Sequence, residues 1–317
     1  MNARRVLLLT AVVAAVAAIS VSLTLTAVMR QPESSGEREV AVSIGLLGEI
    51  VHRLTDGAVR VQVVVPPGAE VHDWEPTPKE VERVKRAVLV FHVIKTLDGW
   101  VVDLVRSAGS GARVIEVAAH PSIKVIRTDG VPDPHVWLSL RNYASMVEVI
   151  ASELVKAFPD LSDRVRSRAE ALKKQVMGLY NEFAPKLEKH RGKPFVTEHL
   201  AFRYLAEEFG LKNLALKGVE EEEPTAKHLL ELKEEIKKHG VKVIYAEPTS
   251  RDHHTHHAHD HHAHASELVE EFAEELGLEI MFLDTMEGLT LEDALNGHGY
   301  LHVMEENLEA LLKGFGS

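Results

Sequence analysis

Residues 63–78 read VVVPPGAEVHDWEPTP, and this stretch decides how the surrounding chain folds. Its β-branched start is typical of a strand, and the Pro-Pro-Gly that follows ends that strand, because proline lacks a backbone N–H and glycine permits positive φ. A second turn, around two further prolines, precedes a charged helical pattern. His72 therefore lies between two stiff turns beyond a strand, as a metal ligand would. A lone histidine of this kind is more often an ordinary surface residue.

Strand and helix patterns alternate along the chain on both sides of this stretch. Strands are predicted in the first half at 40–45, 59–65, 87–91 and 113–117. Strands are predicted in the second half at 194–198, 212–216, 241–246 and 279–284. Short connections with a helix after each strand predict parallel sheets covered on both faces. The fold class is therefore α/β, with two (β/α)4 Rossmann-like lobes.

The domain organisation follows from this alternation. We expect an N-terminal lobe at 40–160, a long linking helix at 161–190 and a C-terminal lobe at 191–317. Residues 1–29 combine two arginines with a long apolar run that is typical of a membrane anchor or signal segment, and 30–39 form a polar tether. Both interpretations place the lobes outside the cytoplasm, tethered to the membrane or, after cleavage, periplasmic or secreted.

The composition excludes several classes of protein. A formal charge of −12 argues against nucleic acid as a partner and is compatible with attracting cations. The chain has no cysteine, so a zinc site must use histidine and carboxylate ligands, and no lipid-bearing cysteine is available. Eighty-four charged residues beside few amides suggest a thermophile.

Five metal-ligating residues come just after predicted strands: His72, His135, His199, Glu247 and Asp284. The carboxyl ends of parallel strands are where open α/β sheets bind ligands. The two edges would face each other across a cleft between the lobes, and three imidazoles with one carboxylate suit tetrahedral Zn²⁺. The sequence therefore predicts one metal site shared by both lobes.

The identity of the fourth ligand stays open at this point. Asp284 is preferred, whereas Glu247 could be a ligand, a partner that orients a ligand histidine, or a cap of the following turn. His92 also ends a strand but follows a fully apolar run, so it is expected to be a core residue more often than a residue of the cleft.

A histidine-rich segment at 251–265 holds eight of the nineteen histidines. It has no periodicity and few apolar side chains, so we expect a mobile loop. It could be an inert insertion, or it could capture metal weakly through auxiliary ligands: His253, His254, His256, His257, His259, His261, His262 and His264.

Three segments carry a resemblance to a known family. They are VVPPGAEVHDWEPTPKEV around His72, DPHVWLSL around His135 and VTEHLAFRYLAEEFGL around His199. The chain resembles the metal-binding solute receptors of ABC importers for zinc and manganese, the ZnuA/TroA-like group, over roughly residues 39–315. This resemblance implies a rigid helix joining the lobes, ligands at the three histidines, and Asp284 at the position of the family's aspartate.

The resemblance also implies a function. We expect an extracytoplasmic, high-affinity zinc receptor, a monomer that delivers Zn²⁺ to an ABC permease and its ATPase and catalyses no reaction. His199 stands where manganese members tend to have glutamate, which favours zinc. The His-rich segment lies in the C-terminal lobe, unlike its usual place in the family, so its family role transfers poorly.

Other functions remain as alternatives. A manganese or iron receptor could use the same scaffold, and a surface adhesin or metal buffer could bind zinc without a transporter. A zinc-dependent hydrolytic enzyme would need an open coordination position for water, with Glu247 as general base. The fourth ligand, protein carboxylate or water, separates the receptor from the enzyme.

Overall fold

The computed structural model describes residues 38–69, 71–72, 74–248 and 264–316. Residues 39–317 form one compact unit, separate from residues 1–38, and the fold below is that of the larger unit. Among the described residues, no helix combines the length and apolar character needed to cross a membrane. The predicted anchor at 1–29, and nearly all of the tether at 30–39, lie outside the described residues.

The N-terminal lobe is built on a parallel four-stranded sheet with the strand order β2-β1-β3-β4. Its strands are β1 (Glu39–Val42), β2 (Arg60–Val63), β3 (Leu89–His92) and β4 (Arg113–Glu116). Its helices are α2 (Gly45–Thr55), α3 (Pro78–Val84), α4 (Lys95–Asp98) and α5 (Trp100–Ser107). Every residue of the central strands β1 and β3 is buried, as expected for parallel strands covered on both faces.

The C-terminal lobe repeats this topology. Its strands are β7 (Pro194–Thr197), β8 (Lys212–Ala215), β9 (Val243–Ala246) and β10 (Glu279–Phe282). The strand order of its sheet, read as β8-β7-β9-β10, is second, first, third, fourth along the chain of this lobe. The N-terminal sheet has the same order. Its helices are α8 (Arg203–Phe209), α9 (Ala226–His239), α10 (Glu267–Leu276), α11 (Leu291–Leu295) and α12 (Tyr300–Gly314). The predicted fold class is confirmed.

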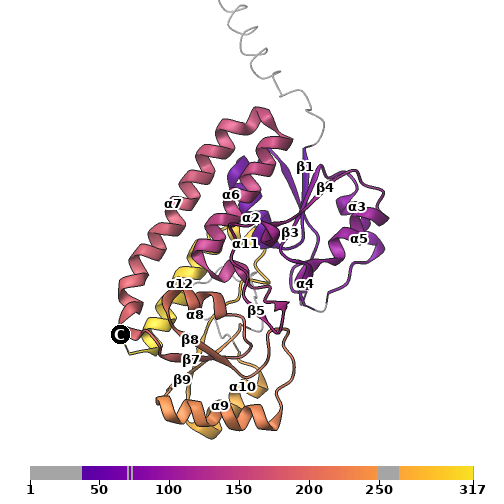
Figure 1. Cartoon of the computed structure of the whole chain (residues 1–317). Coiled ribbons are helices and arrows are strands. Elements are labelled where there is room, and N and C mark those ends of the chain that lie inside the picture. Colours follow the sequence, from indigo (N-terminus) through magenta and orange to yellow (C-terminus); the bar gives the residue numbers. More distant parts are fainter. Residues whose placement is uncertain (1–37, 70, 73, 249–263, 317) are drawn as a thin grey trace, which may run out of the picture. The chain divides into compact units, whose positions relative to one another are not determined.

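Two long helices connect the sheets. Helix α6 (Leu140–Ala157) ends before Pro159, and α7 (Ser162–Leu187) follows after one 3₁₀ turn. At 1.5 Å per residue, α7 is about 39 Å long. It packs against α6, α2 and α12, and Figure 1 shows it running past both lobes. Pro185 lies within its last turn without ending it.

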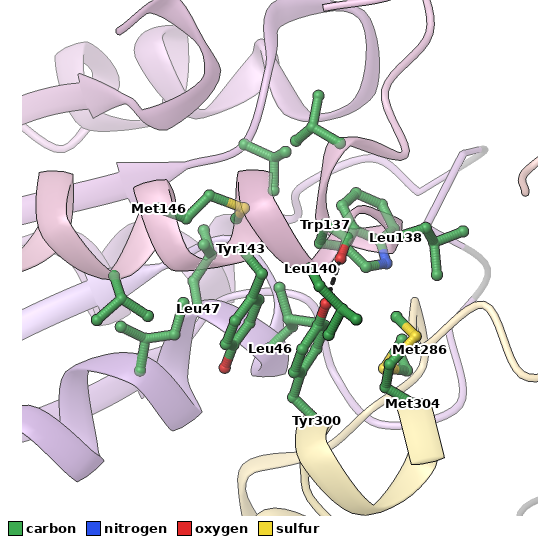
Figure 2. Close-up of a cluster of buried hydrophobic side chains, with 14 of the residues drawn as sticks. Leu46, Leu47, Trp137, Leu138, Leu140, Tyr143, Met146, Met286, Tyr300 and Met304 are labelled. Carbon is green, nitrogen blue, oxygen red and sulfur yellow. Dashed lines mark hydrogen bonds between the residues drawn. The ribbon is translucent and has the colours of Figure 1, made fainter. Parts of the chain in front are cut away.

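A buried cluster joins the C-terminal segments to the N-terminal lobe (Figure 2). The rings of Tyr143, on α6, and Tyr300, on α12, stack with centroids 3.4 Å apart. The Tyr300 hydroxyl donates to the carbonyl of Trp137 at 2.7 Å, and the Trp137 indole N–H donates to the carbonyl of Thr285 at 2.7 Å. The lobes are therefore held together by packing as well as by α7.

The structure differs from the sequence predictions in two local details. The predicted loop before His135 contains a short hairpin of β5 (Arg127–Thr128) and β6 (Val131–Pro132). Its turn is Asp129–Gly130, with both φ angles positive, as a tight hairpin turn requires. The single helix expected between the strands at 87–91 and 113–117 is divided into α4 and α5 at Gly99, the C-cap of α4 and N-cap of α5.

Candidate metal centre

Each of the three histidines is placed by a short segment that follows a strand. After β2 the chain turns at Gly68, whose φ is +76°, and the next turn ends at Thr77, which forms a capping box at the start of α3. His72 lies between them, with 5% of its side chain exposed. His135 follows the hairpin, and His199 comes two residues after β7, where the Thr197 hydroxyl donates to its carbonyl. Both of these are fully or almost fully buried.

The three imidazoles converge on one carboxylate, that of Glu287. Its oxygens lie 2.9 Å from Nε2 of His135, 3.6 Å from Nε2 of His72 and 3.9 Å from Nε2 of His199. One ligand atom from each of the four residues lies within 4.8 Å of all the others. Among the described residues, no other group of three or more possible ligands is this compact.

A second carboxylate lies behind each imidazole. Nδ1 of His135 donates to Asp133 at 2.8 Å, Nδ1 of His72 to Glu220 at 3.0 Å, and Nδ1 of His199 to Glu247. Because each Nδ1 carries its proton toward this partner, each neutral ring presents Nε2 as an electron pair to the centre. This is the arrangement in which histidines bind metal ions.

The Nε2 atoms of the histidines face one another, and this side of the site needs a positive charge. Nε2 of His135 and Nε2 of His199 are only 3.3 Å apart. Two lone pairs at that distance repel each other, unless a proton or a metal cation lies between them or beside them. Three imidazoles and one carboxylate, with their side chains largely buried, are a donor set that fits tetrahedral Zn²⁺.

Protons occupy this site when metal does not. Burial opposes a charge on His72, but Glu220 and Glu287 outweigh it and raise the pKa of His72 to about 11. Burial also opposes a charge on His135, yet Asp133 and Glu287 raise its pKa to about 9. Although burial favours a neutral Glu287, the two histidines hold the pKa of its carboxyl well below the ordinary value. Metal must therefore displace protons from the imidazoles, not from the carboxylate.

We expect zinc binding at pH 7 to release about two protons, one each from His72 and His135, because both pKa values lie above that pH. The affinity should rise as the pH is raised from 7 through about 9, since the competing proton on His135 is then lost. Calorimetry in two buffers of different ionisation enthalpy measures the protons released. Release of well under one proton would contradict this charge assignment.

Glu287 reaches the centre through a strained turn after β10. The Asn307 side-chain amide accepts from the N–H of Asp284 and donates to the carbonyl of Asp284, with both hydrogen bonds 2.8 Å long. Its carboxylate accepts from the N–H of Met286 at 2.7 Å, and Met286 has a φ of +63°. This left-handed residue turns the chain so that Glu287 points at the imidazoles. Asp284 is the preferred fourth ligand from sequence, and in the structure its carboxylate stabilises this turn. The compact group of four possible ligands contains Glu287 and not Asp284.

The other candidates have different positions. Glu247 is the partner of His199, which is the second of the three roles considered for it. His92 is buried beside Asp98, whose carboxylate also accepts from the Ser43 hydroxyl and from two backbone N–H groups, so it belongs to the N-terminal core. His264 is exposed, and the other seven histidines of the auxiliary set, His253 to His262, lie outside the described residues.

A cavity of about 870 Å³ leads to the centre. Its walls are the loop after β2 and residues 284–296, and both Glu287 and Glu247 line it. Further acidic side chains on the walls, Glu221 and Glu292 among them, outnumber the single cation, Arg83. A cavity with this charge favours the approach of a cation to the buried ligands.

Two lobes of equal topology, with a buried ligand set drawn from both, define a metal-binding solute receptor. Over residues 40–314 the chain matches the family described as zinc-uptake complex component A, periplasmic. The chain belongs to this family, the ZnuA family, which is a receptor family and not a family of enzymes. The zinc hydrolase considered from sequence is therefore set aside.

Individual relatives agree with this assignment. The high-affinity zinc uptake system protein ZnuA of Bacillus subtilis is 31% identical over 299 residues, 88% of each chain. The zinc-binding lipoprotein AdcA of Streptococcus pneumoniae is 27% identical, and this chain spans 58% of its length. The crystal structure of pneumococcal AdcAII matches with a TM-score of 0.75 at 25% identity, over 89% of this chain and 99% of that one.

Proposed function

We propose that this protein is an extracytoplasmic receptor that binds one Zn²⁺ tightly through His72, His135, His199 and Glu287. The convergence of three oriented imidazoles on one buried carboxylate supports this proposal most directly. The four ligands close the site, so no position is left for a reacting water.

The receptor would hand its ion to the permease of an ABC importer, which its ATPase drives. The ligands come from loops of both lobes, so small displacements of these loops separate the ligands and release the ion. We propose that the segment at 1–29 tethers the receptor to the membrane, that the receptor acts as a monomer, and that the His-rich segment supplies auxiliary metal ligands. The thermophilic origin inferred from composition also stays a prediction.

Zinc is favoured over manganese and iron by the ligands themselves. Three imidazoles form a softer set than the oxygen-rich sites that manganese prefers. The relatives point the same way, since ZnuA of B. subtilis and AdcA of S. pneumoniae are both named for zinc.

Titration of residues 36–317 with zinc and with manganese tests this function, with a competing chelator to isolate the tight site from weak ones. We expect one tight zinc site, weaker manganese binding and a large loss of zinc affinity in His199→Ala. His239→Ala is the matched control, because His239 lies outside the centre and pairs with Glu235 on its own helix. A preference for manganese, or tight zinc binding that persists in His199→Ala, would overturn the proposal.

A further inference from the structure

A second group of metal-ligating side chains lies on the surface at the start of α12. The rings of His298 and His302 are 5.2 Å apart between centroids and nearly perpendicular, at 80°. Nε2 of His302 lies 3.4 Å from Oε1 of Glu306. The side chains of His302 and Glu306 are 43% and 63% exposed, and His298 is exposed as well. Solvent ions therefore reach all three residues.

The surface group is more open than the buried centre, whose four ligand atoms all lie within 4.8 Å of one another. The ring centroids of the buried histidines are 5.2 to 6.2 Å apart, and His72 and His199 are inclined at 82°. The distances from the buried imidazoles to Glu287 run from 2.9 to 3.9 Å. In the surface group, the His298–His302 and His302–Glu306 contacts fall within these ranges. The three side chains meet in series along the helix and do not all converge as the buried ligands do.

The backbone fixes this arrangement. His302 and Glu306 are four residues apart on α12, so they share one face of the helix. His298 precedes the N-cap Gly299, and its N–H donates to the carbonyl of Asp293 at 2.9 Å. A side chain at Gly299 would lie 2.5 Å from the Glu49 carboxylate, so the chain enters the helix in close contact with α2. This backbone path at the start of α12 places the imidazoles of His298 and His302 side by side.

An ordinary ion pair accounts for only part of this group. His239 and Glu235 on α9 form a similar pair one helical turn apart, at 3.3 Å, and no other histidine ring of the described residues stacks on His239. A second imidazole next to the first adds little in water, and two protonated rings repel each other. A metal ion, in contrast, gains a second nitrogen ligand from it.

We propose that His298, His302 and Glu306 form a second, exposed zinc site, with water completing the coordination. It binds more weakly than the buried centre, because it is open to solvent and offers fewer protein ligands. Asn296, two residues before His298, lines the cavity that leads to Glu287. The second site therefore holds zinc close to the route into the buried centre, and its occupancy does not depend on which ion that centre selects.

Histidine modification by diethyl pyrocarbonate, followed by peptide mass spectrometry, tests this site in the full chain. Cleavage after glutamate yields residues 293–305, which separates His298 and His302 from the His-rich segment. Pro248 blocks cleavage after Glu247, so His239 lies on the peptide 236–267 and its modification is located by fragmentation of that peptide. With zinc in molar excess over the buried centre, we expect both His298 and His302 to be protected and His239 to stay reactive. A titration of the same protein against a competing chelator reports separately on the buried centre.

The variant His302→Ala distinguishes chelation from local burial. Protection of His298 by zinc should disappear in this variant, whereas tight zinc binding at the buried centre should remain. Glu306→Gln should weaken the protection of both surface histidines. The proposal is overturned if zinc protects neither histidine beyond His239, or if His298 stays protected in His302→Ala. Loss of tight zinc binding alone would count against the buried centre instead.

Discussion

Glu287→Gln should lower zinc affinity by about 30-fold or more, while Asp284→Asn should leave it close to that of the unchanged protein. Removing one partner of a buried, paired charge costs about 2–5 kcal/mol, and each 1.4 kcal/mol is tenfold in affinity. Glu287 brings the only carboxylate oxygens in the four-residue group. Its amide analogue keeps the shape of the side chain but loses the negative charge opposite the cation.

Asp284→Asn is the matched control for this prediction. The asparagine side-chain oxygen can still accept from the N–H of Met286, so the turn that presents Glu287 should persist. Competition titrations with a zinc chelator give both affinities. If Asp284→Asn caused the larger loss, the aspartate would be the fourth ligand, as preferred from sequence, and Glu287 would lose that role.

The comparison of these two residues shows what sequence could and could not predict at the site. The three histidines were found because a parallel sheet brings the ends of its strands to one edge, and strand ends are visible as apolar runs closed by turns. The same rule pointed to Asp284, which directly follows β10. Glu287 lies three residues further on and reaches the centre only because Met286 adopts a left-handed conformation. Non-glycine residues rarely do so, and no sequence pattern marked it.

The carboxylates behind the histidines were predictable to different degrees. Glu247 ends β9, so the strand rule found it and left its role open. Asp133 lies two residues before His135 and could have been suggested by that proximity. Glu220 belongs to an acidic run in the other lobe and meets His72 only after folding. Contacts between distant segments depend on how the lobes pack, and periodicity does not report that packing.

The fold itself was predictable because its signals are local. Alternating strands and helices with short connections allow few arrangements, and the parallel order follows from them. The hairpin at 127–132 was missed although Asp129–Gly130 is a favourable turn sequence, because each of its strands has only two residues. The docking of α12 on the N-terminal lobe was not predicted either, since aromatic residues on one helix do not reveal their partner.

That docking leads to a prediction about stability. Trp137→Ala should lower the free energy of unfolding by about 3–5 kcal/mol, the usual cost of truncating a large buried aromatic residue. The Trp137 side chain is fully buried in the cluster of Figure 2, and its backbone carbonyl accepts from the Tyr300 hydroxyl. Chemical denaturation of the metal-free protein measures this loss.

Trp137→Ala should also weaken zinc binding, which a purely structural role elsewhere in the core would not do. The indole N–H donates a hydrogen bond to the carbonyl of Thr285, two residues before Glu287. The ring centroids of Trp137 and His135 are 5.6 Å apart. Phe272→Ala is the matched control, because Phe272 is equally buried but belongs to a separate cluster around α10. Zinc stabilises the folded state by an amount that rises with the logarithm of its affinity. The zinc-induced rise in melting temperature should therefore shrink in Trp137→Ala and persist in Phe272→Ala; an undiminished rise in both variants would show that the cluster supports the fold without positioning the ligands.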